Sequence, residues 1–158
     1  MTDRQDFPLK RSSVVLVVLF TFLTLGIYSG FWYLRRLKGL NALSTETKLP
    51  VVLPIALIAS TIAFRFTPPT AFLWWVFRLA LWLTAVGTAF RVRWMLVEHL
   101  RSRISAVLPM SASIQEQNAP SSLLTFFLNI WYLQYKINEM VDSDAAWQEE
   151  EAAASSTM

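Results

Sequence analysis

The sequence of 158 residues contains no cysteine and only one histidine, His99. Without cysteine, disulfide frameworks and thiolate chemistry are excluded. A lone histidine beside Glu98 lacks the third ligand of a catalytic zinc site, so we expect His99 to lie on an exposed polar face. There is also no phosphate-binding glycine loop and no Gly-x-Ser-x-Gly motif. We therefore expect a protein that is not an enzyme and holds no cofactor or metal.

Charge is scarce as well: 16% of the residues are charged and 54% are apolar, against about 25% and 45–50% in soluble domains. The net charge of +3 comes from cations beside apolar runs rather than from a basic stripe. That distribution favours anchoring at lipid headgroups over contact with nucleic acid. The lipid bilayer is the expected partner, and no nucleic-acid partner is expected.

Uninterrupted apolar length predicts the membrane spans. Residues 12–34 carry no charge, and about 20 helical residues cross roughly 30 Å of hydrocarbon. This run is too long for a secretory signal, whose apolar core has about 7–15 residues. Second and third spans are predicted at residues 49–64 and about 71–90, with a tight turn at 67–70 between them. The third helix is expected to continue along the headgroups through the basic segment that follows.

The segment at residues 121–140 has an apolar core near the length that separates a span from an interfacial helix. We expect a short fourth C-terminal helix that inserts and packs through the Asn129–Gln134 region; three spans remain the alternative. The fold class is therefore all-α: a polytopic transmembrane helical bundle of three long spans plus this fourth helix. The predicted organisation is a basic N-terminal flank at 1–11, a membrane helical domain at 12–140 and an acidic disordered tail at 141–158.

Small residues recur four apart within the apolar runs. Helices in lipid associate where small side chains let their backbones approach closely. The GxxxG spacing therefore predicts a helix-packing face, and two alanine pairs repeat it. The predicted packing residues are Gly26, Gly30, Ala59, Ala63, Ala85 and Ala89. They serve either packing within one chain or contact with another copy or another membrane subunit.

A family resemblance rests on the segment after the basic flank, with Thr-x-Gly-Ile-Tyr, an aromatic Trp-Tyr pair and a later Leu-Asn. The matching residues are Arg11, Thr24, Gly26, Ile27, Tyr28, Trp32, Tyr33, Leu40 and Asn41, and the ending at 132–138 adds Gln134 and Asn138. This pattern resembles the bacterial domain-of-unknown-function family 4234. The resemblance implies a small multi-pass protein of the bacterial inner membrane and implies no activity.

Ionisable or amide side chains at membrane depth are functional candidates. Arg78 lies inside the third predicted span, beside Trp74 and Trp75; it either stacks on these rings and reaches the 67–70 turn or serves a pathway. The amides Asn129, Gln134 and Asn138 occupy polar faces of the last helix.

Two functions remain open at this stage. One is a non-enzymatic scaffold or accessory subunit of an envelope complex. The other is a small oligomeric channel or transporter with Arg78 and the C-terminal polar stripe at its pathway. With four spans, the positive-inside rule places the first and third loops in the cytoplasm and both termini outside.

Overall fold

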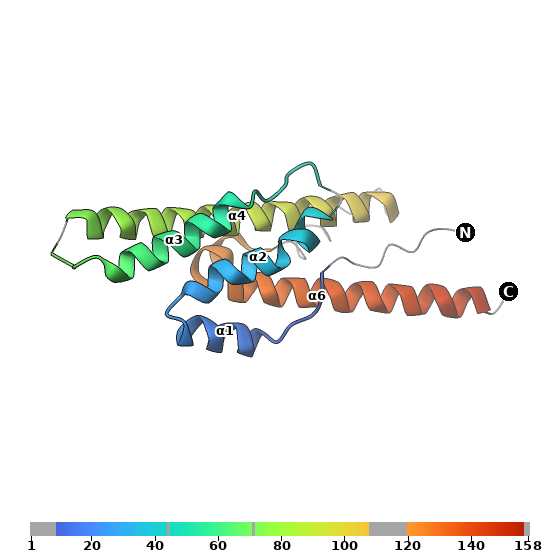
Figure 1. Cartoon of the computed structure of the whole chain (residues 1–158). Coiled ribbons are helices and arrows are strands. Elements are labelled where there is room, and N and C mark those ends of the chain that lie inside the picture. The colour runs from blue at the N-terminus through green and yellow to red at the C-terminus, as the bar shows by residue number, and fades with distance from the viewer. Residues whose placement is uncertain (1–8, 44, 71, 108–119, 157–158) are drawn as a thin grey trace.

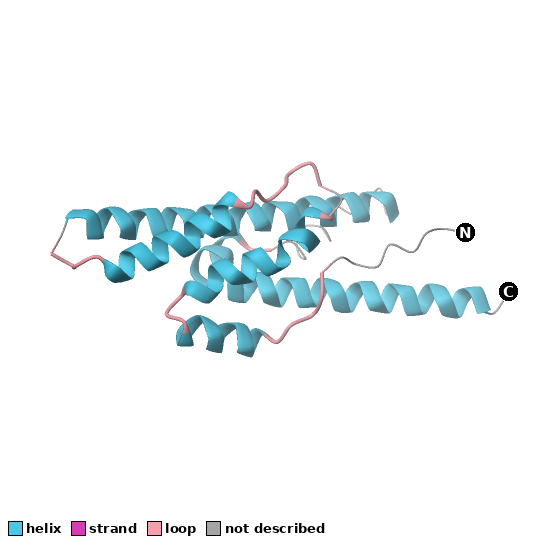
Figure 2. Ribbon diagram, in the orientation of Figure 1, coloured by secondary structure: helices cyan, strands magenta, loops and turns pink. Residues whose placement is uncertain are grey.

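The computed structural model describes residues 9–43, 45–70, 72–107 and 120–156. Within these residues all regular structure is helical, as the sequence predicts (Figure 2). The helices are α1 (Val14–Leu23), α2 (Ile27–Asn41), α3 (Val52–Phe66), α4 (Phe72–Val107) and α6 (Ser122–Ser156). They form two helical hairpins, α1–α2 and α3–α4, with α6 lying along α4 and α1 (Figure 1).

The first hairpin contradicts the single span predicted at residues 12–34. Helix α1 ends at Leu23, and Leu25 and Gly26 adopt left-handed backbone conformations with φ of 52° and 96°. A left-handed residue other than glycine costs about 1–2 kcal/mol, whereas glycine tolerates it freely. Gly26 is thus the N-cap of α2. The spacing predicted that Gly26 and Gly30 share one continuous helical face, and the structure does not form that face.

The second hairpin joins α3, of 15 residues, to α4, of 36 residues. The predicted turn at 67–70 is present, and α4 continues through the basic segment as expected. Among the described residues, only the Phe72–Ser102 part of α4 is long and apolar enough to cross a membrane. The prediction of three long spans is therefore not supported, because the first predicted span is split and the second is short.

The last helix is also different from its prediction. Asn129 interrupts α6 with a non-helical conformation (φ 41°, ψ −120°), so residues 121–140 do not form one straight segment. Beyond that kink the helix continues to Ser156, where the sequence predicted a disordered tail from residue 141. Residues 108–119, between α4 and α6, lie outside the described residues.

The core occupies the half of the bundle away from the α3–α4 turn. Its fully buried side chains come from every packed helix: Val17, Tyr33, Leu40, Leu57, Met95, Leu96, Leu133 and Ile137. In α4, burial begins at Thr88, and none of residues 72–87 is buried. The turn half of the α3–α4 hairpin therefore presents an apolar surface, with Phe66 85% and Phe72 80% exposed.

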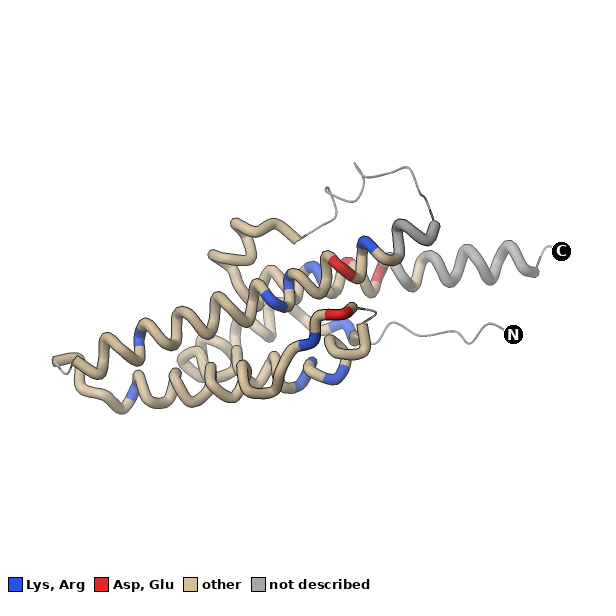
Figure 3. The backbone as a smooth tube through the Cα atoms, turned by 90° about the horizontal axis from the view of Figure 1, so that it is seen from above, with Lys and Arg blue, Asp and Glu red and all other residues tan. Residues whose placement is uncertain are grey.

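Charge divides the molecule along the same axis. Arg65 and Arg78 lie towards the α3–α4 turn, whereas most Lys and Arg residues gather at the other end (Figure 3). Hydrogen bonds tie that basic end together: Arg91 Nε donates to the Lys48 carbonyl at 2.8 Å, and the Glu46 N–H donates to Glu98 at 3.1 Å. The fold therefore has one apolar end and one basic end.

Candidate functional site

The main concentration of buried polar groups lies where the start of α1, the middle of α2 and α6 meet. We call it the polar network, defined as Ser12, Trp32, Tyr33, Arg36, Asn129, Gln134 and Asn138. Helical spacing explains how it assembles: Trp32 and Arg36 on α2, and Gln134 and Asn138 on α6, are each four residues apart and share a face.

Asn138 joins α6 to the backbone of Ser12, two residues before α1. Its Oδ1 accepts the Ser12 N–H at 3.1 Å, and its Nδ2 donates to the Ser12 carbonyl at 2.7 Å. Gln134 Nε2 donates to the same carbonyl at 3.2 Å and to Asn138 Oδ1 at 2.6 Å. The two amides thus satisfy both backbone groups of Ser12 at the point where α1 begins.

The aromatic pair of α2 completes the network from the other side. Trp32 Nε1 donates to Gln134 Oε1 at 3.0 Å. The Tyr33 hydroxyl donates to Asn129 Oδ1 at 2.7 Å, and Asn129 Nδ2 reaches the Ala85 carbonyl of α4 at 3.4 Å. Because Tyr33 and Gln134 are fully buried, leaving any of these groups unpaired would cost about 1–3 kcal/mol.

Arg36 is the charged member of the network. As a cation that follows the aromatic residues 31–33, it is expected on the water side of the headgroups, but only 8% of the residue is exposed. Its Nη2 donates to Ser12 Oγ at 2.9 Å, and the guanidinium lies 5.3 Å from the Trp32 ring centroid. Burial lowers the pKa of Arg36 from its ordinary value, and the neighbouring charge of Arg35 lowers it further.

The resemblance residues outside the network have local structural roles. Arg11 pairs with Asp142 of α6 at 3.0 Å, both exposed. Asn41 brackets the following loop, because its Nδ2 donates to the Leu49 carbonyl at 2.9 Å and its Oδ1 accepts the Leu49 N–H at 2.7 Å. Thr24 Oγ1 accepts the Tyr28 N–H at 2.9 Å and so closes the α1–α2 turn.

The small residues divide between inner and outer faces. Gly30 is buried where α2 meets α3, and a Cβ built there would lie 2.4 Å from Ile58 and 3.1 Å from the Pro54 carbonyl. Ala89 is buried and Ala85 packs against the core. Ala63 is half-buried, whereas Ala59 is exposed. At Gly30, Ala85 and Ala89 the small residues thus pack within the chain.

Arg78 does not join the polar network. It is exposed, and its guanidinium lies 5.2 Å from the Trp74 ring and 5.8 Å from the Trp75 ring. This is the stacking alternative raised by the sequence. Arg78 and the amides of α6 therefore belong to two separate clusters.

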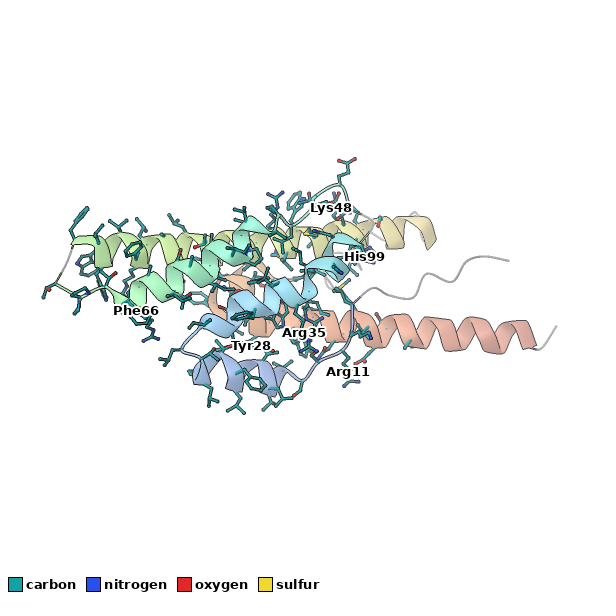
Figure 4. The ribbon with its side chains drawn as sticks, viewed as in Figure 1. Arg11, Tyr28, Arg35, Lys48, Phe66 and His99 are labelled. Carbon is teal, nitrogen blue, oxygen red and sulfur yellow. The ribbon has the colours of Figure 1, made fainter. Side chains whose placement is uncertain are left out.

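His99 also differs from expectation. The sequence placed the histidine on an exposed polar face, but His99 is only 6% exposed and lies at the basic end near Lys48 (Figure 4). Among the described residues, no group of three or more His, Cys, Asp or Glu side chains is arranged to hold a metal ion.

Sequence reasoning found the three amides of α6 but missed Ser12, which bonds to Gln134 and Asn138, and Arg36, which bonds to Ser12. Ser12 contributes mainly backbone groups, which carry no side-chain signal. Arg36 looked like one more interfacial cation, and only its spacing of four from Trp32 pointed inward.

Comparison with known proteins identifies no relative, so the functional conclusion rests mainly on this geometry. The family resemblance described above is not supported by that comparison and stays a hypothesis. No protein family, curated protein or solved structure matches the chain.

Proposed function

We propose that the chain is a non-enzymatic scaffold or accessory subunit of an envelope complex, held in the bacterial inner membrane. The main support for a structural role is that the polar groups of the network form hydrogen bonds with one another. Its amides, indole, hydroxyl and guanidinium are engaged with one another or with the Ser12 and Ala85 backbones. A network arranged in this way stabilises a fold and leaves few donors or acceptors for a substrate.

Membrane placement draws support from the apolar end. The Phe72–Ser102 segment has the length and hydropathy of a span, and only 11% of its most apolar window is buried within the chain. A soluble core helix would be mostly buried. Exposed Phe66, Phe72 and Trp75 are the kind of surface that lipid or another membrane subunit covers.

The channel hypothesis has less support. It requires Arg78 and the polar stripe of the last helix to line one path. In the fold Arg78 stacks on tryptophans of its own helix, while Asn129 breaks the stripe and binds Tyr33 and Ala85.

Purification in a mild detergent, followed by mass spectrometry of the intact assembly, tests the proposal. We expect a stoichiometric foreign membrane subunit to co-purify and to survive dilution. A homo-oligomer that conducts ions in planar bilayers would refute the scaffold role and restore the channel hypothesis. Recovery of the protein in the soluble fraction after alkaline carbonate extraction would refute membrane placement itself.

A further inference from the structure

The turn between α1 and α2 combines two properties that seldom occur together in water. Its side chains are apolar and exposed: Phe22 is 65%, Leu23 74% and Leu25 60% exposed. A turn at a soluble surface is usually polar, since it lies in water and water satisfies its backbone. Here the outward surface is that of a lipid-facing segment.

The backbone of this turn is closed by internal hydrogen bonds. From Thr24 to Ser29 every N–H group has a partner within the hairpin. The bonds are Thr24 N to Phe20 O at 3.0 Å, Leu25 N to Phe22 O at 3.0 Å, Gly26 N to Thr21 O at 2.8 Å, Ile27 N to Thr24 O at 3.1 Å, Tyr28 N to Thr24 Oγ1 at 2.9 Å and Ser29 N to Gly26 O at 3.1 Å. No donor in this stretch depends on water.

The carbonyl groups at the tip of the turn are covered as well. The carbonyl of Leu25, which lies between the two helices, accepts a hydrogen bond from Arg65 Nη2 of α3 at 3.2 Å. The Gly26 carbonyl accepts from Ser29 N at 3.1 Å and from Ser29 Oγ at 2.5 Å. In hydrocarbon each unsatisfied backbone group costs several kcal/mol, so a turn at that depth must be closed in this way.

Length and charge give the depth of the hairpin. Helix α1 has ten residues and rises about 15 Å, half of a hydrocarbon core of roughly 30 Å. Basic residues occur only at the open end of the hairpin, at Lys10 and Arg11 on one arm and at Arg35, Arg36 and Lys38 on the other. Tyr28 lies near the turn and Arg35 further along α2, towards the end where Lys48 lies (Figure 4).

We propose that α1–α2 is a re-entrant hairpin: it enters the bilayer, turns at Thr24–Gly26 among lipid acyl chains, and leaves on the side from which it entered. Residue 10 and the α2–α3 loop then lie on the same side, whereas a single span at 12–34 would separate them. This inference rests on the proposed membrane placement, and it replaces the predicted outward position of the N-terminus.

Single-cysteine labelling tests the inference cleanly because the chain has no native cysteine. The variants are Lys10→Cys and Glu46→Cys at the open ends of the hairpin, Leu25→Cys in its turn, and Ala42→Cys as an exposed control at the end of α2. A membrane-impermeant maleimide is applied to intact cells and to lysed cells. Membrane insertion of each variant is first checked by alkaline carbonate extraction.

We expect Lys10→Cys and Glu46→Cys to be labelled from the same side. In membranes, Leu25→Cys is expected to react about tenfold or more slowly than Ala42→Cys, since hydrocarbon disfavours the reactive thiolate. After transfer to denaturant the two rates should converge.

Labelling of residues 10 and 46 from opposite sides, in a protein that stays in the membrane fraction, would overturn the hairpin and leave the membrane placement standing. Equal rates at residues 25 and 42 in membranes would also overturn it, because the turn would then lie in water. Extraction of the unmodified chain by carbonate would overturn both proposals together.

Discussion

Substituting Gly30 by alanine is the most direct test of how α2 packs on α3. The added Cβ would lie 2.4 Å from Ile58 Cγ1, which real Cβ atoms do not approach, and 3.1 Å from the Pro54 carbonyl. The Ile58 atom is in the middle of its side chain and the Pro54 atom is backbone, so neither moves cheaply. Overpacking of this kind costs about 1–3 kcal/mol of stability.

Gly87→Ala is the matched control. Gly87 also lies inside a helix, α4, but a Cβ added there meets nothing within 4 Å. Both substitutions gain the same helix-propensity term of about 0.5–1 kcal/mol, and this term cancels when the two variants are compared. The remaining difference in free energy of unfolding should be about 1–3 kcal/mol, with Gly30→Ala the less stable variant.

Reversible unfolding in mixed detergent micelles, followed by tryptophan fluorescence, measures this difference. Oligomer size is recorded alongside, because the sequence also allowed the small-residue face to bind another copy. Equal stability of the two variants would refute the close α2–α3 contact. A change in oligomer size without a change in unfolding free energy would place Gly30 between chains instead.

Three further substitutions, one of them with a matched control, and one topology measurement test the rest of the fold. Gln134→Leu leaves Trp32 Nε1 buried without its acceptor and should cost about 1–3 kcal/mol, whereas the exposed Tyr135→Phe should change stability by less than about 0.5 kcal/mol; equal losses would refute the polar network. Asn41→Ala removes both hydrogen bonds to Leu49 and should speed proteolysis within residues 42–49 by at least about fivefold. An unchanged rate would show that these two bonds do not hold the loop. Arg78→Gln removes only an exposed cation–π stack and should cost about 0.5–1 kcal/mol of unfolding free energy; complete loss of folding would show a role beyond stacking. Because the cations gather at one end, the positive-inside rule predicts that the α2–α3 loop of the membrane-inserted chain lies in the cytoplasm, and labelling of Glu46→Cys in intact cells would contradict that orientation.

The sequence predicted the class of the fold and several of its parts. Apolar run length and scarcity of charge gave an all-helical chain, and the paired prolines at 68 and 69 located the α3–α4 turn. Helical periodicity continues through the basic segment, and it correctly predicted that α4 extends through this segment. These features depend on local composition, which a single sequence displays directly.

The failures share a different physical origin. An uncharged run of 23 residues, 12–34, gives the same hydropathy whether it is one helix or two, and the break depends on a left-handed Leu25-Gly26 pair. The kink at Asn129 is likewise held by partners far away in sequence, Tyr33 and Ala85. A local pattern does not encode those distant contacts, so the kink at Asn129 was missed, just as hydropathy alone missed the break at residues 25 and 26.

The polar network was predicted only in part for a related reason. Gln134 and Asn138 stand out as amides in an apolar helix, and they are indeed buried or half-buried in the fold. Their main partner is the backbone of Ser12, which has no distinguishing side-chain signal. Arg36 was read by its charge alone, although its spacing from Trp32 placed it on the inner face.

The span of the polar network along the chain sets an order on biosynthesis. Trp32 and Gln134 are 102 residues apart, and Ser12 and Asn138 are 126 apart. At about 5–20 residues per second, a ribosome needs roughly 5–20 s to make the first of these intervals. Throughout that interval the newly made first hairpin holds the Trp32 indole and the Tyr33 phenol without their final partners. These buried groups of the first hairpin therefore gain their partners only after α6 has been made, and a chain truncated before Asn129 leaves the Trp32 indole and the Tyr33 hydroxyl unpaired.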